Sequence, residues 1–393
     1  MAIQNLQTLL GKEVRGRRVF VRADLNVPLD EGKLRDDTRI RAALPTLRAL
    51  CEAGARVVLA SHLGRPKGQR TPENSLRPVA VRLSELLDRD VSFVGECVGA
   101  EAEAAVSALR DGDVLLLENL RFHPGEEAND PEFSRNLARL ADFYVNDAFG
   151  TSHRAHASTV GIAAYIDEAF AGDLLQTELR KLAAVQNPKR PLLCLLGGAK
   201  VSDKLAVLEA LAPHTDVLAV GGAMAYTFLA ARGEPTGTSL VEPNRLEDAR
   251  RIIEAAENSG RRLLLPVDHR VTQEIAEGAA SRVEKEIPDG WMGVDIGPES
   301  AALYAREARE AMTVFWNGPM GVFEIEAFAK GTETVAQAVA ESSADSIVGG
   351  GDSLAAINRL GLGDRIGRLS TGGGASLEYV QGLTLPGVAA LEH

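Results

Sequence analysis

Two lysines flank a predicted strand-to-helix turn near the middle of this 393-residue chain. The apolar run Leu192–Leu196 ends at Gly197, which favours a buried strand followed by a turn, and Ser202 is a suitable cap for the helix that follows. A helix start attracts anions, so Lys200 and Lys204 beside it predict a phosphate site between two amines. The alternative is a pair of solvated lysines, and the Gly-Lys-Ser/Thr of a Walker A loop does not follow the glycines.

Polar and basic residues follow each predicted strand in the first half of the chain. Strands are predicted at Arg18–Ala23, Arg56–Ala60, Val114–Leu117 and Phe143–Val145, alternating with helices at Thr38–Cys51, Arg77–Leu87 and Pro131–Leu140. This order implies a parallel sheet whose ligand crevice lies beyond the carboxyl ends of the strands. The residues at those ends include Asp24, Asn26, His62, Arg65, Arg121, His123, Arg154 and His156, and Arg39 opens the first helix.

Arginine holds carboxylate and phosphate groups through charge-assisted, bidentate hydrogen bonds. In an acidic protein, a local group of arginines and histidines at one edge of a sheet therefore predicts a pocket for a small polyanion. Asp24 and Asn26 would suit hydroxyl groups of that ligand. Each residue taken alone is equally well interpreted as an ordinary surface or structural side chain.

The second half of the chain repeats the strand–helix pattern and adds two triple-glycine turns. Strands are predicted at Val217–Val220, Leu263–Leu265, Thr313–Trp316, Ser346–Val348 and Leu369–Ser370. The turns at 349–351 and 372–374 let backbone N–H groups approach phosphate oxygens, which predicts a nucleotide-binding domain. Asp352 is either a helix cap or, beside a polyphosphate, a Mg²⁺ ligand. Glu324 is either a surface charge or a ligand of ribose hydroxyls.

The composition excludes several classes of protein. A net charge of −12 and a pI near 5.2 argue against nucleic-acid binding. No apolar run approaches the roughly 20 residues of a membrane span, and the first residues lack the pattern of a signal peptide. The three cysteines, Cys51, Cys97 and Cys194, are far apart and odd in number, which fits a reducing cytoplasm. Cys51, in a helical stretch, and Cys194, in an apolar strand, are predicted to be buried thiols and not ligands.

A predicted helix at Asp173–Gln186, followed by Pro188 and Pro191, separates the two halves. We therefore predict an α/β protein with two doubly wound, Rossmann-like parallel-sheet domains, joined by a hinge helix and with a cleft between them. The alternative is that this helix simply packs inside one domain.

Ten segments, in order along nearly the whole chain, resemble the phosphoglycerate kinase family of the bacterial type. They are VRADLNVPL (21–29), DDTRI (36–40), SHLGRP (61–66), ENLRFH (118–123), NDAFGTSHRAHAS (146–158), LGGAKVSDK (196–204), WNGPMGVFE (316–324), GGGDS (349–353), STGGGAS (370–376) and LPGVAAL (385–391). Several of these motifs are long and specific.

The resemblance implies a role for individual residues and for each part of the chain. Residues 1–173 would bind 3-phosphoglycerate or 1,3-bisphosphoglycerate through Asp24, Asn26, Arg39, His62, Leu63, Gly64, Arg65, Arg121 and Arg154. Residues 174–187 would form the interdomain hinge helix, and 188–376 would bind ATP or ADP through Lys204, Asn317, Glu324, Gly350, Gly351, Asp352 and Ser353. Asp352 would hold Mg²⁺, and Arg39, Lys200 and Gly373, with the backbone of its neighbours, would surround the transferring phosphoryl group. The tail, about 377–393, would pack on the first domain, where Gln381 and Leu383 depart from the family pattern and leave the tail contacts open.

The implied reaction is reversible phosphoryl transfer between ATP and the carboxylate of 3-phosphoglycerate. A carboxylate is already ionised at neutral pH, so the reaction needs positioning, charge stabilisation and domain closure but no general base. The resemblance also implies a cytoplasmic monomer. Two other classes remain: a nicotinamide-dependent dehydrogenase, for which G-x-G-x-x-G after a strand is missing, and a nucleotide sensor without catalysis, which would not need the arginine residues.

Overall fold

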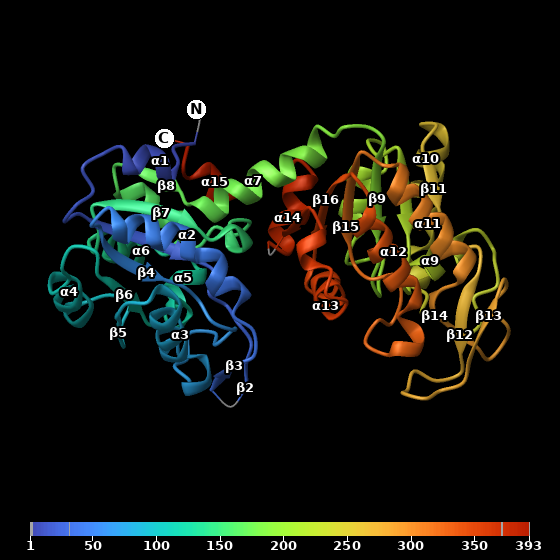
Figure 1. The fold of residues 1–393 in the computed structure, drawn as a ribbon, viewed down its shortest axis with the longest axis horizontal. Coiled ribbons are helices and arrows are strands. Elements are labelled where there is room, and N and C mark those ends of the chain that lie inside the picture. Colours follow the sequence, from blue (N-terminus) through green and yellow to red (C-terminus); the bar gives the residue numbers. More distant parts are fainter. Residues whose placement is uncertain (1–2, 31, 371, 393) are drawn as a thin grey trace. The chain divides into compact units, whose positions relative to one another are not determined.

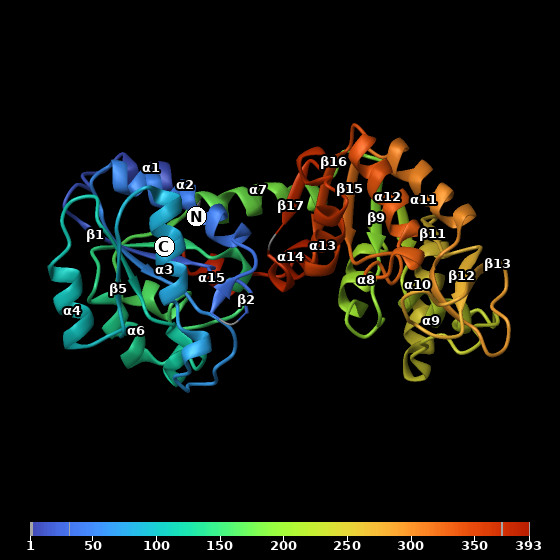
Figure 2. The same cartoon turned by 60° about the horizontal axis from the view of Figure 1, so that its bottom comes forward.

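Runs of buried aliphatic residues form the central strands of two separate parallel sheets (Figures 1 and 2). The computed structural model describes residues 3–30, 32–370 and 372–392. All five residues of β9 (Leu192–Leu196) are buried, as are five of the six in β1 (Arg18–Ala23). Strands buried on both faces are typical of sheets covered by helices on each side, so the predicted α/β class with two doubly wound domains is confirmed. One compact unit comprises Met1–Arg180 and Thr384–His393, and the other comprises Lys181–Leu383.

The first unit contains a six-stranded sheet in which every neighbouring pair is parallel. In spatial order its strands are β5 (Val91–Val94), β6 (Val114–Leu117), β4 (Arg56–Ala60), β1, β7 (Phe143–Asp147) and β8 (Ala169–Ala171). The chain passes from β1 to β4 on one side and later returns to β7 on the other side. The loops after β1 and β7 therefore diverge at a topological switch point, where such sheets bind their ligands.

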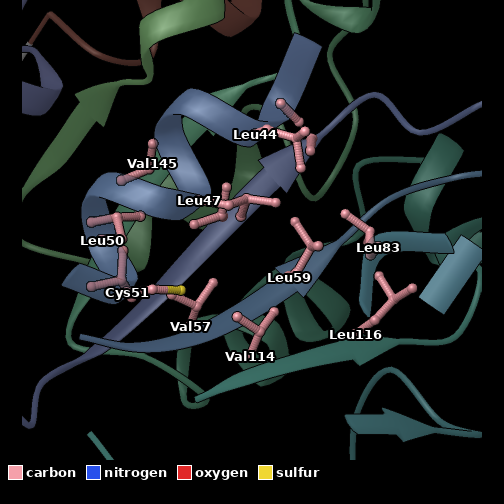
Figure 3. Close-up of a cluster of buried hydrophobic side chains, with 14 of the residues drawn as sticks. Leu44, Leu47, Leu50, Cys51, Val57, Leu59, Leu83, Val114, Leu116 and Val145 are labelled. Atoms are coloured by element: carbon pink, nitrogen blue, oxygen red, sulfur yellow. The ribbon is translucent and has the colours of Figure 1, made fainter. Parts of the chain in front are cut away.

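Helix α2 (Thr38–Glu52) covers one face of this sheet. Figure 3 shows its Leu44, Leu47 and Leu50 lying over aliphatic side chains of the strands, with Cys51 at the same contact. The alternating residues Phe20 and Tyr144, adjacent in register across β1 and β7, belong to the opposite face. This two-sided burial fixes the strand register, and with it the position of every residue that follows a strand.

The remaining helices of the first unit lie between these strands in the sequence, except for the first, which precedes β1, and the last, in the C-terminal tail. They are α1 (Leu6–Leu10), α3 (Arg77–Leu87), α4 (Ala100–Ser107), α5 (Pro124–Glu127), α6 (Pro131–Ala138) and α15 (Pro386–Ala389). The tail helix α15 is held by β7 and the loop that follows it: Asn146 Nδ2 donates to the Gly387 carbonyl at 3.0 Å, and the Gly387 N–H donates to the Ser152 carbonyl at 2.8 Å. Helix α7 (Asp173–Gln186) begins in this unit and ends in the second.

The second unit contains another six-stranded parallel sheet with the order expected for a nucleotide-binding fold. Its strands are β11 (Arg262–Leu264), β10 (Val217–Val220), β9, β15 (Thr313–Asn317), β16 (Asp345–Gly349) and β17 (Arg368–Ser370). Its helices are α8 (Leu205–Leu211), α9 (Met224–Ala231), α10 (Leu246–Asn258), α11 (Pro298–Glu310), α12 (Lys330–Glu341), α13 (Gly351–Arg359) and α14 (Gly374–Val380). The switch point lies between β9 and β15, because the chain continues from β9 to β10 on one side and reaches β15 on the other.

Two smaller antiparallel elements were not predicted. A three-stranded sheet follows β11 in the chain, with the order β13 (Ser281–Glu284), β12 (His269–Thr272) and β14 (Met292–Ile296). A two-residue ladder joins β2 (Leu29–Asp30) to β3 (Lys33–Leu34). Both consist of short strands with mixed polar and apolar residues, which carry little periodic signal.

Three local predictions need correction. Ser202 does not cap α8, because the helix begins at Leu205 with Lys204 at the cap position, and Ser202 instead donates its backbone N–H and hydroxyl to Glu242. Asp352 is not a cap either, since Gly350 holds the cap position of α13 and Asp352 lies in the first turn. The predicted strand at 263–265 is shifted by one residue from β11. The expected burial of Cys51 and Cys194 is confirmed, Cys97 is buried as well, and all three thiols are free.

Among the described residues, no helix is both long enough and apolar enough to cross a membrane.

Candidate functional site

The loop after β1 and the first turn of α2 are joined by an ion pair. Arg39 Nη1 lies 3.0 and 2.9 Å from the two carboxylate oxygens of Asp24, which is buried. The next polar residue, Asn26, accepts a hydrogen bond from the Gly64 N–H at 2.8 Å through its side-chain oxygen. The loops after β1 and β4 are thereby tied together, and Asp24 orients a guanidinium whose remaining donors are available to a ligand.

A buried asparagine holds the loop after β4 against the loop after β6. Asn119 donates to the Leu63 and Asn74 carbonyls at 2.7 and 2.9 Å, and its oxygen accepts from the backbone N–H groups of Leu63 and Arg121 at 3.2 and 3.0 Å. Arg121, itself buried, donates to the Gly64 carbonyl at 2.8 Å and lies 3.2 Å from a Glu127 oxygen. The predicted residues Leu63, Gly64 and Arg121 are thus held together by hydrogen bonds, although they come from two different loops.

The two buried histidines of this region are held neutral. The pKa of His62 lies well below its usual value because of burial and, next, the charges of Arg22, Arg121 and Arg39. Burial, followed by the charges of neighbouring arginines, lowers the pKa of His156 to about 4. We define the basin as Arg39, Arg121 and the loops after β1, β4, β6 and β7. Its arginines therefore supply positive charge at neutral pH, and these two histidines do not.

The remaining predicted arginines of the basin are solvent-exposed. Arg65 follows Gly64 in the loop after β4. Arg154 lies in the loop after β7, where its Nε is 3.2 Å from His153 Nε2. Both belong to loops at the carboxyl edge of the sheet, as predicted. Their exposed side chains are free to rearrange around an anion.

The second unit has a cavity of about 580 Å³ at the carboxyl edge of its sheet. It is bordered by loops that follow β9, β10, β15 and β16 and by strand β14; its lining comprises Gly198, Ala199, Gly222, Ala223, Thr238, Ser239, Leu240, Val241, Ile275, Met292, Gly293, Val294, Pro319, Gly321, Val322, Glu324 and Asp352. The wall is mostly aliphatic, with two hydroxyl residues and two carboxylates. Such a cavity can take a flat, weakly polar ring and still offer polar groups at its edge.

The loops after β9 and β15 approach so closely that only glycine fits. A Cβ on Gly197 would overlap the Pro319 carbonyl oxygen, and a Cβ on Gly318 would overlap the Gly197 carbonyl oxygen. Gly318 also has φ +96°, a conformation that other residues rarely adopt. The Trp316 indole N–H fixes this turn by donating to the Gly318 carbonyl at 2.7 Å. Gly197 and Gly198 were predicted as a simple turn. In the structure this turn also packs closely against the loop after β15.

Lys204 and the loop after β16 meet at Asn317. The Lys204 ammonium group bonds to the side-chain oxygen of Asn317, while the buried Asn317 Nδ2 has no partner among the described residues. Ser353 is buried and accepts the Gly318 N–H at 2.6 Å, and Gly350, with φ +94°, passes close to Asn317. Burial lowers the pKa of Lys204, an effect that the carboxylates of Asp352 and Asp203 oppose.

The other predicted residues of the second unit lie around this cluster. Glu324 and Asp352 are exposed at the cavity wall, and Lys200 is exposed next to the lining residue Ala199. Gly351 opens α13. Gly373 precedes α14 with φ +52°, and an added Cβ there would meet open space. Thr371, part of the same predicted glycine turn, lies outside the described residues.

A bound divalent metal would have to draw most of its ligands from a substrate. In the chain as described, His, Cys, Asp and Glu side chains form no group of three that could hold a metal ion. Of the two exposed carboxylates that line the cavity, Asp352 is the one whose charge acts on Lys204. A single carboxylate fits Mg²⁺, which commonly binds one or two carboxylates together with phosphate oxygens and water.

Sequence reasoning missed the residues that support the site. Asn119 was predicted only as part of the motif ENLRFH, with no role of its own, and the aliphatic wall formed by Leu240, Ile275 and Met292 was not predicted. Leu240 and Ile275 are about half exposed (49% and 55%) despite being large and apolar, which becomes visible only in three dimensions. For Asn119, its position directly after a strand was the one available signal.

An arginine-lined basin in one doubly wound unit and a nucleotide-sized cavity in the other are typical of two-domain kinases that act on small acids. The family model for phosphoglycerate kinase matches residues 9–383. Phosphoglycerate kinases of Moorella thermoacetica and Clostridium botulinum (strain Alaska E43 / Type E3) are 55% and 53% identical over 387 and 391 residues; each match covers 98% of this chain, and 98% and 99% of the respective relatives.

Solved structures agree with this match. The phosphoglycerate kinase from Coxiella burnetii superposes with a TM-score of 0.90 at 42% identity, covering 100% of this chain and 99% of that one. The enzyme from Pyrococcus horikoshii OT3 superposes with a TM-score of 0.85 at 32% identity, covering 99% and 98%. The chain therefore belongs to the phosphoglycerate kinase family. It is a phosphotransferase of glycolysis with a carboxyl group as acceptor.

Proposed function

We propose that the first unit binds 3-phosphoglycerate in the basin. Arg39, Arg65, Arg121 and Arg154 hold its phosphate and carboxylate groups, since guanidinium groups match both anions in geometry. Asp24 and Asn26 take the hydroxyl group, and His62 donates a hydrogen bond. The backbone of Leu63 and Gly64 forms the wall, which Asn119 keeps in place.

The second unit binds ATP or ADP in its cavity. The adenine ring lies against the aliphatic wall, and Glu324 accepts hydrogen bonds from ribose hydroxyls. Lys204 with Asn317, and the turn of Gly350, Gly351, Asp352 and Ser353 at the start of α13, hold the phosphates, where the helix N-terminus favours negative charge. Two observations support this placement: Asn317 Nδ2 has no partner among the described residues, and the Lys204 ammonium group, which has three donors, gives only one to Asn317. Both groups can therefore donate to phosphate oxygens.

Phosphoryl transfer needs charge stabilisation and alignment but no general base. The acceptor carboxylate is ionised, and the neutral histidines of the basin do not have to take a proton. Arg39, Lys200 and the backbone of 372–374, around Gly373, stabilise the charge on the transferring group. When Mg²⁺ is bound beside Asp352, it neutralises negative charge on the nucleotide phosphates.

The two ligand sites belong to different units, so we propose that transfer requires closure about α7. Closure would exclude water and so suppress hydrolysis of ATP.

In functional terms the 3-phosphoglycerate domain is 1–173, the hinge helix 174–187 and the nucleotide domain 188–376, and the enzyme acts as a cytoplasmic monomer. The observation that carries the whole proposal is the difference between the sites: a group of arginines at the edge of one sheet, and an aliphatic cavity with Lys204 nearby at the edge of the other.

A coupled assay tests this function. Purified protein with Mg-ATP and 3-phosphoglycerate should form 1,3-bisphosphoglycerate, detected through its reduction. The Lys200→Ala variant should lose about a hundredfold in kcat, and EDTA should abolish turnover. Lys189→Ala, which removes an exposed lysine next to the prolines, is the matched control and should keep full activity. A folded protein that binds ATP but shows no turnover dependent on 3-phosphoglycerate would contradict the proposal.

A further inference from the structure

Behind the basin, four side chains from four separate segments form one buried chain of hydrogen bonds. Ser158 Oγ donates to Glu126 Oε1 at 2.6 Å and accepts from Arg22 Nε at 2.8 Å. At the other end of the guanidinium, Arg22 Nη2 lies 3.2 Å from His62 Nδ1. Glu126, Ser158 and Arg22 have no exposed surface, and His62 is 3% exposed.

The donors of this chain determine where the protons are. An arginine has N–H donors and no acceptor, so His62 Nδ1 can only accept from Arg22 and must be unprotonated. A neutral imidazole has one protonated nitrogen, which must then be Nε2. Ser158 has one hydroxyl proton, and because that proton goes to Glu126, its oxygen is left to accept from Arg22.

This chain of hydrogen bonds also contains two opposite charges, the Arg22 guanidinium and the Glu126 carboxylate. A fully buried guanidinium is costly unless it has a counter-ion, and Glu126 is the buried carboxylate that reaches it through Ser158. The second Glu126 oxygen accepts the Ser158 backbone N–H at 3.0 Å, which anchors the carboxylate. His156 Nδ1 lies 3.8 Å from Glu126 Oε1, beyond hydrogen-bond range. Among the residues that the structure describes, Glu126 therefore has one route of short hydrogen bonds toward the basin, and this route ends at His62.

We propose that Glu126 is a positioning residue which, through Ser158 and Arg22, fixes His62 as the neutral Nε2–H tautomer. This inference rests on the proposed binding of 3-phosphoglycerate at His62. The opposite tautomer would turn a lone pair toward the anionic ligand. The fixed tautomer presents a hydrogen-bond donor instead, and the ring needs no proton exchange with solvent when the ligand arrives.

The first test does not involve the reaction. Long-range ¹H–¹⁵N correlation spectra of protein labelled on its histidines report which ring nitrogen carries the proton, and a His62→Gln variant assigns the signals. At neutral pH the spectrum of His62 should show a protonated Nε2 and an unprotonated Nδ1. A protonated Nδ1, alone or in an imidazolium ion, overturns the proposal even if the enzyme is fully active, so this failure differs from failure of the proposed function.

The second test removes the Ser158 hydroxyl and so interrupts the chain of hydrogen bonds. Ser158→Ala should raise the KM for 3-phosphoglycerate about tenfold and leave the KM for ATP unchanged, because a charge-assisted hydrogen bond is lost behind one ligand site only. The same variant should mix the two tautomers of His62. Glu126→Gln, which keeps the shape and removes the charge, should act in the same direction.

Ser300→Ala is the matched control. Ser300 Oγ donates to Asp268 Oδ1 at 2.6 Å, and both residues are buried, so this variant also removes one buried serine–carboxylate bond. It should lower thermal stability like Ser158→Ala but should not change the KM for 3-phosphoglycerate or the His62 spectrum. A folded Ser158→Ala protein that keeps both the KM and the tautomer of the parent overturns the proposal. If the variants do not fold, the spectrum of the unmodified protein still decides.

Discussion

At the scale of single residues, the basin differs from the pattern that predicted it. The sequence places four histidines in its loops, and they counted toward its positive charge together with the arginines. Burial and nearby guanidinium groups lower the pKa of His62 and His156, and burial lowers that of His123. These rings are therefore neutral at neutral pH, which could not be predicted because burial depends on segments far apart in the chain.

A buried histidine outside the basin predicts how stability depends on pH. Burial lowers the pKa of His269, packed beside Tyr226, from 6.5 to about 4. Folding thus favours the neutral ring, and this contribution is fully present above pH 6.5 and is lost as the pH falls toward 4. At pH 5 the loss is about 2 kcal/mol.

Thermal unfolding at pH 7 and pH 5 checks this prediction. His269→Leu, which cannot take up a proton, should lose less stability on acidification than the parent. His214→Leu, at an exposed position, is the control and should behave like the parent. Equal losses in the parent and in His269→Leu would show that burial of this ring does not set the acid sensitivity.

At the scale of elements, the sequence predicted most of the strands that contain a run of at least three apolar residues. β1, β4, β6, β9 and β10 were found within a residue of their observed bounds, because strands buried on both faces leave a continuous signal. β5 and β8 were missed: β5 has the mixed sequence VSFV, and β8 has three residues. The start of α8 was misplaced because Ser202 bonds to Glu242, forty residues away, and long-range partners leave no local trace.

The contact between the loops after β9 and β15 gives a prediction for the nucleotide site. Gly197→Ala should force these loops apart, destabilise the second unit by about 3 kcal/mol and weaken ATP binding at least about tenfold. The expected cause is the overlap of the new methyl group with the Pro319 carbonyl. Calorimetric titration with ATP and thermal unfolding measure the two effects.

Gly363→Ala is the control in the same unit, since its Cβ would have only ordinary contacts, 3.6 Å to the nearest atom. It should bind ATP like the parent. Normal ATP affinity of Gly197→Ala would mean that the spacing of these loops does not shape the nucleotide site.

At the scale of the molecule, the division into two sheet-based units and the placement of the polar residues at strand ends followed from the order of elements alone. The ligand identities required the motifs, because an arginine basin by itself specifies only an anion. The supporting residues Glu126 and Ser158 could not be predicted, and Asn119 had only its position after a strand as a signal: each is an ordinary polar residue in the sequence, with partners far away along the chain.

Closure about α7 predicts a change in size that depends on both ligands. The radius of gyration measured by X-ray scattering should fall when 3-phosphoglycerate and a nonhydrolysable Mg-ATP analogue are present together, and fall less with either one alone. An unchanged radius at saturating concentrations of both would contradict transfer by domain closure.

The central claim is that charges from both units stabilise the transferring phosphoryl group, and Arg39 tests it most directly. We would measure kcat at saturating 3-phosphoglycerate and Mg-ATP for Arg39→Ala and for Arg41→Ala. Arg41 lies on the same helix, is exposed and pairs with Asp37 at 2.8 Å, so its loss should change little. The account predicts a fall of about a hundredfold in kcat for Arg39→Ala and none for Arg41→Ala. Unchanged turnover in a folded Arg39→Ala protein that binds both substrates would contradict it.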